Sequence, residues 1–531
     1  MRSVGAVTIN SSYVHTSPSV RILRNIARAG GIRDAWCDEF LPTNGIPEMA
    51  ARIIERKAPI LGISVHIWNR HESLELAREI KRLSSGTRII AGGPGLSSDM
   101  MPPSGVDVLV RGEGEMDWAR QLGLDAAHAG PSFFYTEEDA ALLKNRIVYV
   151  ESTRGCNNSC AFCQSGSAQE RERPYLPAGG IDALVRHVAW LSACGAKCIK
   201  FLDRTFNSSP TRSLELMKLL HDAAGRSQIH FEIRPELLDE QTIEFLSSCR
   251  PGAFRLEAGV QSLNAIALKA SGRGCAPLAA LAALGRLVSA GTAVVHADLL
   301  WGLPREDMRS IKSGFDRLYL SGPPEEIQLG FLKLLPGTRM RDIAKEHAYI
   351  WNQTPPYEFI QNNTLCPLEV AQLKKFARAF NVFYNSGRFS RTIPLALARS
   401  GLLPFAFFEK LALALEESGP SNALDGLFRI FLNQFGHLDP IADHLRLDYA
   451  LGQKVMRLPG FLTAQVDITL ADERCLHVRR DNSVVFLALE HAPAPHGTGV
   501  FEKKCPALYR IDRKPDGLHE FTLLARAQRS K

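Results

Sequence analysis

Alternating apolar and amphipathic segments constrain the fold of this 531-residue chain more than any other feature. Such alternation is typical of consecutive strand and helix units that build a parallel sheet. The first series predicts strands at 4–9, 60–65, 88–91 and 106–110. Apolar residues at helical spacing after Pro47 and over 76–83 predict helices between them. Residues 1–122 are therefore expected to form a doubly wound, Rossmann-like α/β domain.

Polar and glycine-rich segments follow each of these predicted strands, at 10–15, 64–69, 92–95 and 111–115. Doubly wound sheets bind ligands beyond the carboxyl ends of their strands. Glycines at strand ends let the backbone approach a bulky ligand closely. The four segments are thus expected to form the rim of one ligand site.

A second alternating series begins at Arg146. It predicts strands at 147–152, 198–203, 230–233, 255–260, 294–299 and 327–334, with helices between them such as 181–193, 211–224 and 277–290. Six strand–helix units in sequence predict a partial parallel barrel over residues 146–345, with its chemistry at the carboxyl ends of the strands. Residues 123–145 show no strong periodicity and are expected to be a linker.

The remaining residues, 346–531, change character and predict a smaller accessory region with both helices and strands. The pattern indicates helices at 370–384, 404–417 and 423–435, and then strands near 464–470, 483–489 and 520–524. We find no internal repeat in the sequence.

Composition excludes several classes of protein. Hydrophobic residues at 45% and charged residues at 22% are ordinary globular values, and the net charge of +7 is spread along the chain, which argues against a nucleic-acid partner. The most apolar stretch, 395–415, contains Arg399 and Glu409, which are costly in hydrocarbon, so we expect two amphipathic helices and no membrane partner. The N-terminus lacks a secretory signal, and the 11 cysteines are an odd number, so we expect a cytoplasmic protein.

Three cysteines lie within eight residues, in the loop that follows the first predicted barrel strand. Cys156, Cys160 and Cys163 have the spacing Cys-x-x-x-Cys-x-x-Cys. A structural zinc site normally has four ligands, and no fourth ligand lies nearby in the sequence. Three thiolates suit a [4Fe–4S] cluster in which one iron remains open to an external chelator.

This spacing, with the aromatic Phe162 before the third cysteine, strongly resembles the radical S-adenosylmethionine (SAM) superfamily. The segments LEAGVQS (256–262), DLLWGLP (298–304) and LKLLPGT (332–338) fall at the ends of the fourth, fifth and sixth strands, where the family places its cofactor motifs. Together with the N-terminal domain, the chain resembles a cobalamin (B12)-binding radical SAM enzyme of a subgroup that carries a DUF4080 domain. The specific motifs cover roughly the first two-thirds of the chain.

The resemblance implies a [4Fe–4S] cluster, SAM and cobalamin as cofactors, and an electron donor of the flavodoxin or ferredoxin type. Cys156, Cys160 and Cys163 would hold the cluster. The residues implied for SAM are Phe162, Asp203, Arg204, Arg234, Glu257, Gln261 and Ser262.

One family motif differs here, because FLDRTFN (201–207) replaces the Gly-Gly-Glu that binds the SAM ammonium. Asp203 is therefore assigned to that ammonium, with Arg204 beside it, and Arg234 to the methionine carboxylate. Glu257 and its neighbours would contact the ribose or the substrate, or alternatively satisfy backbone groups at strand ends.

The Asp-x-His-x-x-Gly motif that supplies a cobalt ligand in many cobalamin proteins does not follow the first strand. The resemblance therefore implies cobalamin with its dimethylbenzimidazole detached and without a protein histidine on cobalt, while His15 and His66 remain alternative ligands. Trp68 is either a wall of this site or a core aromatic. The residues implied for cobalamin are Asn10, Ser11, His15, Ser64, Val65, Trp68, Gly92, Gly93, Pro94, Gly112, Glu113 and Gly114.

Three functions remain open from the sequence. The favoured one is methylation of an unactivated carbon by a 5′-deoxyadenosyl radical and methylcobalamin. The first alternative is a radical rearrangement, cyclisation or oxidation without methylation, and the second is a non-catalytic cobalamin or SAM sensor or scaffold. A methylthiotransferase is disfavoured, because those enzymes carry three further cysteines in the N-terminal region, which here contains only Cys37. The substrate is not predicted.

Overall fold

A computed structural model of the chain divides it into two compact units. The first comprises residues 1–311 and 321–366, and the second comprises 312–320 and 367–531. The structure describes residues 3–96, 101–167, 171–274, 276–419, 423–452, 458–463, 484–493, 500–513 and 519–526.

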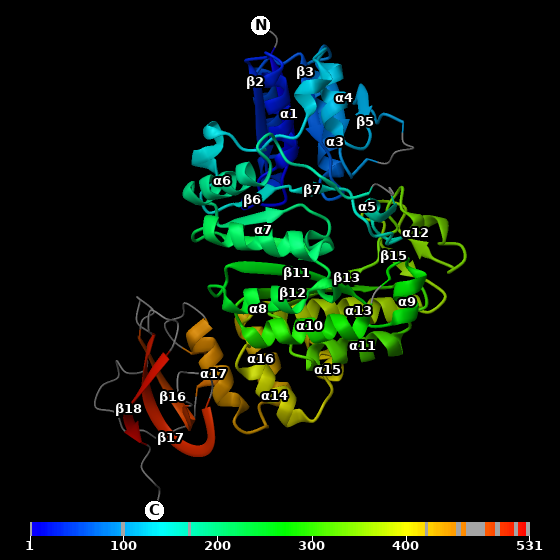
Figure 1. Cartoon of the computed structure of the whole chain (residues 1–531). Coiled ribbons are helices and arrows are strands. Elements are labelled where there is room, and N and C mark those ends of the chain that lie inside the picture. Colours follow the sequence, from blue (N-terminus) through cyan, green and yellow to red (C-terminus); the bar gives the residue numbers. More distant parts are fainter. Residues whose placement is uncertain are drawn as a thin grey trace, which may run out of the picture. The chain divides into compact units, whose positions relative to one another are not determined.

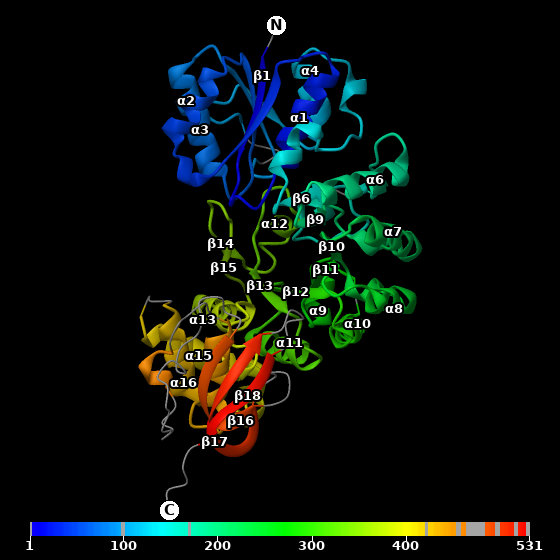
Figure 2. The same ribbon diagram turned by 90° about the vertical axis from the view of Figure 1, so that its left-hand side faces the viewer.

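The first unit opens with a five-stranded parallel sheet in the order β2-β1-β3-β4-β5. Its strands are β1 (Val4–Ile9), β2 (Ala35–Phe40), β3 (Ile60–Ser64), β4 (Arg88–Gly92) and β5 (Val108–Val110). Its helices are α1 (Pro18–Ala29), α2 (Ile46–Glu55), α3 (Arg70–Leu83) and α4 (Gly114–Gln121). Figure 2 shows α2 and α3 on one face of the sheet and α1 and α4 on the other. The predicted doubly wound domain is confirmed.

The central strands of this sheet are buried on both faces, which explains their continuous apolar sequences. All six residues of β1 are buried, and Val7 and Leu61 are fully inaccessible to solvent. The edge strand β2 was not predicted, because its sequence AWCDEF has polar residues where the central strands have apolar ones.

The second sheet has six parallel strands in the order β13-β12-β11-β10-β9-β6, as Figures 1 and 2 show. They are β6 (Ile147–Val150), β9 (Cys198–Phe201), β10 (Gln228–Ile233), β11 (Phe254–Gln261), β12 (Val294–Trp301) and β13 (Glu326–Phe331). The helices α6 (Gly180–Ala193), α7 (Pro210–Ala223), α8 (Glu240–Ser248) and α10 (Pro277–Ala290) lie on one side of it (Figure 2). The predicted partial barrel is confirmed, with β6 and β13 at its edges.

Burial alternates strictly along β11, one of the central barrel strands. In β11, Phe254 and Leu256 are buried, whereas Arg255 and Glu257 between them are half-buried. Successive side chains of a strand point to opposite faces of a sheet. The helix-covered face is therefore apolar, and the opposite, concave face is polar and partly open.

Residues 123–145, expected to be a linker, pack onto the first domain through a buried ion-pair cluster. They form two short 3-10 helices, at Ala126–Ala129 and Glu137–Leu142. The buried Asp139 pairs with Arg24 at 2.7 Å and with Arg21 at 3.2 Å, both on α1. This segment shows no periodicity in the sequence because its packing depends on one charged residue rather than on an apolar face.

The second unit contains the helices α13 (Pro367–Phe380), α14 (Thr392–Ser400), α15 (Pro404–Glu417), α16 (Leu424–Phe435) and α17 (Ile441–Gly452). The antiparallel strands β16 (Val484–Pro493), β17 (Val500–Arg513) and β18 (His519–Arg526) follow them. The strand predicted near 464–470 lies outside the described residues. The hairpin β14 (Ile350–Trp351) and β15 (Phe359–Gln361) belongs to the first unit, beyond the predicted barrel boundary.

An aromatic core holds the helices of the second unit together. The rings of Phe376 and Phe405 stack with centroids 4.1 Å apart, and Phe315 meets Phe376 edge-on at 5.1 Å. The apolar stretch 395–415 forms parts of the two helices α14 and α15, as predicted. Among the helices that the structure describes, none combines the length and the apolar character needed to cross a bilayer.

Candidate functional site

The three clustered cysteines lie in the loop that leaves β6, at the carboxyl end of the barrel. They follow the short strand β7 (Thr153–Arg154) and precede the short helix α5 (Gln164–Ser167). The amide of Cys163 donates to the carbonyl of Cys160 at 3.1 Å, and the amide of Ala161 donates to the carbonyl of Ser271 at 2.8 Å. Cys156, Cys160 and Cys163 are all free thiols.

Nitrogen donors surround two of these thiols. The backbone amide of Asn158 lies 3.5 Å from Cys156 Sγ and its side-chain amide 3.4 Å, while Arg273 Nη1 lies 3.8 Å from Cys160 Sγ. Donors of this kind stabilise a thiolate, as ligation to iron requires. Burial raises the pKa of the Cys160 thiol, and the charge of Arg273 opposes this shift.

The arrangement fits a multi-iron cluster better than a single ion. Within the described residues, no group of three or more His, Cys, Asp or Glu side chains converges on one metal position. In a [4Fe–4S] cluster each cysteine binds a different iron, so the sulfurs need not converge. The three free thiols, two of them beside nitrogen donors, therefore suit the predicted cluster.

Asp203, at the end of β9, is fully buried and anchors the start of the cysteine loop. One carboxylate oxygen accepts from the amide of Ser152 at 2.9 Å, and the other accepts from the hydroxyl of Thr153 at 2.9 Å. Burial raises the pKa of Asp203. Its contact with the SAM ammonium stays a prediction, and this burial weighs against it. The neighbouring Arg204 is exposed.

Arg234, at the end of β10, contacts the same cysteine loop through Asn158. Its guanidinium pairs with Glu236 at 2.6 Å and donates to the side chain of Asn158 and to the carbonyl of Gly274. The pairing of Arg234 with the methionine carboxylate stays a prediction. Phe162 is half-buried in the loop.

The end of β11 holds a buried carboxyl group that the sequence analysis missed. Gln261 has a positive φ of 68° beside a register shift in β11, and the hydroxyl of the following Ser262 donates to Glu306 Oε1. Glu306 is 3% exposed, and its Oε2 has no hydrogen-bond partner among the described residues. Burial raises the pKa of Glu306 to about 8, so this side chain is mostly protonated at neutral pH.

Glu257 lies in the middle of the concave face rather than at the strand end. Its carboxylate is 2.8 Å from Lys200 Nζ and 3.0 Å from His230 Nε2. Burial raises the pKa of Glu257, but the hydrogen bond with His230 and the charge of Lys200 outweigh this effect and hold the pKa well below its usual range. Its contact with the ribose or the substrate stays a prediction.

The loop after β1 attaches the N-terminal domain to the barrel. Asn10 Nδ2 donates to the carbonyl of His15 at 3.0 Å, and His15 Nδ1 lies 2.7 Å from the Tyr149 hydroxyl. The amide of Thr16 donates to the carbonyl of Ile147 at 3.3 Å. The predicted cobalamin-binding edge therefore adjoins the first barrel strand. Ser11, in the same loop, is exposed.

Asn69, whose role the sequence analysis did not predict, joins the loops after β1 and β3. This buried side chain accepts from the amide of His66 at 2.7 Å and donates to the carbonyl of Ile9 at 2.9 Å. Ser64 Oγ accepts from Ser19 at 2.8 Å. Val65 is fully buried, so only its backbone is available to a ligand.

The loop after β4 packs backbone against backbone. Gly93 has a φ of 121°, and a Cβ atom there would lie 2.4 Å from the carbonyl oxygen of Val65. Only glycine fits such a position. Gly92 ends the strand and pairs with Val65 through its carbonyl, and Pro94 is exposed.

Trp68 stands out from the loop after β3. It is 62% exposed and stacks on His66 with ring centroids 4.3 Å apart, so the alternative of a core aromatic is wrong. Burial lowers the pKa of His66 to about 4, which keeps its imidazole neutral. Trp68 borders a cavity of about 450 Å³ that Arg70, His71 and Pro355 also line.

The loop after β5 is tied to the barrel by charge. Glu113 pairs with Arg154 at 3.5 Å and with Arg173, and Arg154 also pairs with Glu115 at 2.7 Å. Gly112 has a φ of 71° and open space where a Cβ would stand, and Gly114 begins α4. The open glycine and the exposed tryptophan are the features here that fit a large planar ligand.

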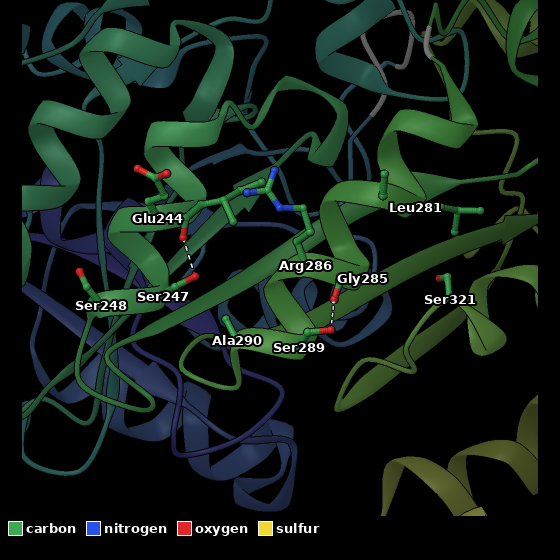
Figure 3. A pocket seen from close by; sticks show the side chains of 11 residues that line it. Glu244, Ser247, Ser248, Leu281, Gly285, Arg286, Ser289, Ala290 and Ser321 are labelled. Atoms are coloured by element: carbon green, nitrogen blue, oxygen red, sulfur yellow. Dashed lines mark hydrogen bonds between the residues drawn. The ribbon is translucent and has the colours of Figure 1, made fainter.

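A second cavity, of about 840 Å³, lies in the helix layer between α8 and α10. Figure 3 shows Glu244, Ser247, Arg286 and Ser289 around it. It contains none of the predicted site residues, and we assign it no part in the chemistry.

Three family models match successive stretches of the chain. A model of the B12 binding domain matches residues 4–117, a model of the radical SAM superfamily matches 150–318, and a model described as a protein of unknown function (DUF4080) matches 345–492. The fold and the three-cysteine loop thus define a radical SAM protein. More particularly, the chain carries a B12 binding domain and a DUF4080 region beside its radical SAM domain, and these domains imply a [4Fe–4S] cluster, SAM and cobalamin as cofactors.

Two characterised relatives match over 365 residues, or 60% of this chain. One is 2-(S-pantetheinyl)-carbapenam-3-carboxylate methyltransferase of Streptantibioticus cattleyicolor, which is 24% identical and is covered over 53% of its length. The other is the cobalamin-dependent radical SAM methyltransferase TokK of Streptomyces tokunonensis, which is 22% identical and is covered over 52% of its length. The match therefore spans about half the length of each relative.

Solved structures share the fold. TsrM from Kitasatospora setae, a radical SAM methyltransferase with cobalamin and a [4Fe–4S] cluster bound, has a TM-score of 0.55 at 17% identity, covering 69% of this chain and 83% of that chain. The cobalamin-dependent SAM radical enzyme OxsB has a TM-score of 0.54 at 12% identity, covering 86% of this chain and 73% of that chain.

Proposed function

We propose that the chain is a cobalamin-dependent radical SAM methyltransferase that methylates an unactivated carbon of a molecule bound in the barrel. The observation that carries this proposal is the attachment of the loop after β1 to β6, through His15 and Tyr149. This attachment supports a single reaction space served by both cofactor-binding domains. The two methyltransferase relatives support the same reaction type.

When bound, the cofactors supply a 5′-deoxyadenosyl radical that removes hydrogen and a methyl group carried by cobalamin. The chain holds them in place. Cys156, Cys160 and Cys163 ligate the cluster, and Arg234 and Asn158 brace their loop. Phe162, Arg204, Gln261 and Ser262 are proposed to line the SAM site.

The cobalamin site is proposed at the loops of the first sheet. Its walls are Trp68 and the glycine loops after β4 and β5, with Asn10, Ser64 and Pro94 at the rim. His15 Nδ1 already contacts Tyr149, and His66 stacks on Trp68. These contacts support a cobalt without a histidine ligand from the protein.

Reduction of the cluster requires an external electron, which we assign to a flavodoxin or ferredoxin type of donor. The described cysteines are all free thiols, including the half-buried Cys37 and Cys194 and the exposed Cys366. Free thiols and a reducible cluster suit a reducing compartment, so we propose that the enzyme works in the cytoplasm.

The test replaces Cys156, Cys160 and Cys163 together by alanine and measures 5′-deoxyadenosine formed from SAM under strict exclusion of oxygen. We expect its formation to be abolished. A matched control replaces three other free cysteines, Cys37, Cys194 and Cys366, by alanine, and should retain 5′-deoxyadenosine formation. Unchanged SAM cleavage in the first variant would contradict the assignment.

The products also separate methylation from other radical chemistry. Methyl transfer yields S-adenosylhomocysteine together with 5′-deoxyadenosine, whereas rearrangement or oxidation yields 5′-deoxyadenosine with little S-adenosylhomocysteine. Quantifying both products by chromatography therefore decides between the two reactions.

A further inference from the structure

Three charged side chains with little exposure lie beside the cysteine loop. We call Arg234, Glu236 and Arg273 the charge triad. The first two follow β10, and Arg273 follows the short helix α9 (Ala265–Ala270). Their side chains are only 10%, 9% and 7% exposed, respectively. Because arginine stays charged in proteins, the two cations and one anion leave the triad with a surplus of one positive charge.

Arg273 acts on Cys160 directly. Its Nη1 lies 3.8 Å from Cys160 Sγ, and its Nη2 donates to the carbonyl of Gly259, which fixes the guanidinium. The preceding Gly272 has a φ of 67°, and a Cβ atom there would lie 2.6 Å from the carbonyl oxygen of Ser159. Only glycine allows this close approach, so the backbone itself places Arg273 against the sulfur.

Arg234 acts on Cys156 through a side-chain amide. Its Nη1 donates to Asn158 Oδ1, and Asn158 Nδ2 donates to Cys156 Sγ at 3.4 Å. The buried Asn207 holds the backbone of Arg234, because its side chain accepts from the Arg234 amide at 2.9 Å and donates to the Arg234 carbonyl at 2.8 Å. Hydrogen bonds in a chain polarise one another, so the guanidinium charge strengthens the donation to the sulfur.

Glu236 links the two arginines and offsets part of their charge. Its Oε1 lies 2.6 Å from Arg234 Nη2 and 4.0 Å from Arg273 Nη2. The closer contact makes Arg234 one half of an ion pair, whereas Arg273 keeps most of its charge. Charges with so little exposure are weakly screened by water and salt. The triad therefore presents unequal charges to the two sulfurs, and the stronger positive charge lies at Cys160.

Charge beside a cysteine ligand affects how easily a [4Fe–4S] cluster is reduced. Reduction adds one negative charge to the cluster, and its potential depends on the net charge nearby and on hydrogen bonds to the sulfurs. A cation beside a cysteine sulfur stabilises the reduced form, and a carboxylate at similar depth destabilises it. Arg273 and Glu236 therefore have opposite effects on the same electron transfer.

We propose that the charge triad sets the reduction potential of the cluster, because Arg273 raises this potential and Glu236 limits the rise. The inference rests on the proposed function, since it takes Cys156, Cys160 and Cys163 as the cluster ligands. In this role the members of the triad are positioning residues, because they act through the cysteines rather than on the carbon that is methylated. Their balance determines how strong a reductant the electron donor has to be.

The test is a redox titration of the holoenzyme without SAM, in which electron paramagnetic resonance follows the reduced cluster. Arg273→Gln removes the cation, so we expect a more negative midpoint potential than in the wild type. The equilibrium constant of reduction should fall about tenfold, which is about 59 mV for one electron. Glu236→Gln removes the anion and should shift the potential in the opposite direction. Shifts of the same sign, or no shift, would overturn the proposal.

Further variants separate the effect of charge from damage to the loop. Arg273→Lys keeps the cation and should recover most of the wild-type potential, and combining Arg273→Gln with Glu236→Gln keeps the net charge and should do the same. The control variants Arg286→Gln and Glu240→Gln make matched charge changes in an exposed ion pair between α10 and α8. They should leave the potential unchanged, and an equal shift in them would overturn the proposal. Iron content checks that each variant holds the cluster, and if Arg273→Gln loses it, the sign of the Glu236→Gln shift decides.

The two proposals fail separately, because the titration uses neither SAM nor substrate. Opposite shifts in the two variants, in an enzyme that forms no S-adenosylhomocysteine, would refute the methyl transfer and leave the role of the charge triad intact. Formation of 5′-deoxyadenosine and S-adenosylhomocysteine by an enzyme whose variants show no shift would refute the role of the charge triad and leave the reaction intact.

Discussion

His15 Nδ1 lies 2.7 Å from the hydroxyl oxygen of Tyr149, and this contact joins the loop after β1 to the first strand of the barrel. His15 comes from the domain assigned to cobalamin, and Tyr149 precedes the cysteine loop by seven residues. Burial lowers the pKa of His15 and raises that of Tyr149, which favours a neutral hydrogen bond over a charged one. The contact therefore holds at neutral pH.

Removing the Tyr149 hydroxyl should loosen this junction. We expect Tyr149→Phe to lower the free energy of unfolding by about 1 kcal/mol, the usual worth of one hydrogen bond, and to speed cobalamin loss. Differential scanning fluorimetry and a cobalamin release assay measure the two effects. Tyr13→Phe is the control, since Tyr13 is 65% exposed. Equal effects of both changes would contradict this role for Tyr149.

Asp139 should be essential to the packing of residues 123–145. Asp139→Asn leaves the buried Arg21 and Arg24 without this counter-ion, which costs about 3 kcal/mol of stability. The adjacent Glu138 pairs with Arg24 and Arg28 but is 44% exposed, so Glu138→Gln should cost under about 1 kcal/mol. Chemical denaturation compares the two, and a similar loss in both would count against the buried cluster.

Glu306 should make the protein less stable as the pH rises. Its folded pKa of about 8 lies above its ordinary value of 4.5, so the folded state binds the extra proton. Its contribution to stability is complete below about pH 4.5 and is lost progressively as the pH rises toward about 8. Glu306→Gln should flatten this part of the stability profile, as melting temperatures at several pH values would reveal. An unchanged slope contradicts the assignment.

Gly93 should be required for the loop after β4. Gly93→Ala places a methyl group against the carbonyl of Val65 at a backbone angle that alanine rarely adopts, costing about 1–3 kcal/mol. We expect loss of cobalamin from the purified variant. Gly86→Ala is the control, because Gly86 has open space around it. Normal cobalamin content in Gly93→Ala would show that this loop is not part of the proposed cobalamin site.

Local patterns predicted most of the fold. All six barrel strands begin within two residues of their predicted starts, because apolar runs bounded by turns are a local signal. The cysteine loop was equally predictable, since the fixed spacing of its three ligands can be recognised in the sequence without knowledge of the tertiary structure. The edge strand β2 and the packing of Asp139 depend on distant partners and left no periodic pattern.

Site residues were harder to predict than elements. Asp203 and Arg234 were assigned to SAM by their places at strand ends, yet in the structure they pair with Ser152 and Glu236. Those pairings depend on the tertiary packing. The polar face of the barrel strands did leave a signal, because polar residues such as His296 and Asp298 occupy alternate positions in β12. Glu306 and Arg273 left no signal in the sequence, because a single buried charge in a loop belongs to no periodic pattern or motif.

In the proposed function, one chain brings cobalamin to a radical SAM cluster. The most direct test is the cobalamin and iron content of protein produced with ample cobalamin and purified without oxygen, with electron paramagnetic resonance of the Co(II) form. We predict near-stoichiometric cobalamin with a base-off signal beside about four iron atoms per chain. Absence of cobalamin beside an intact cluster would contradict the claim and favour radical chemistry without methyl transfer.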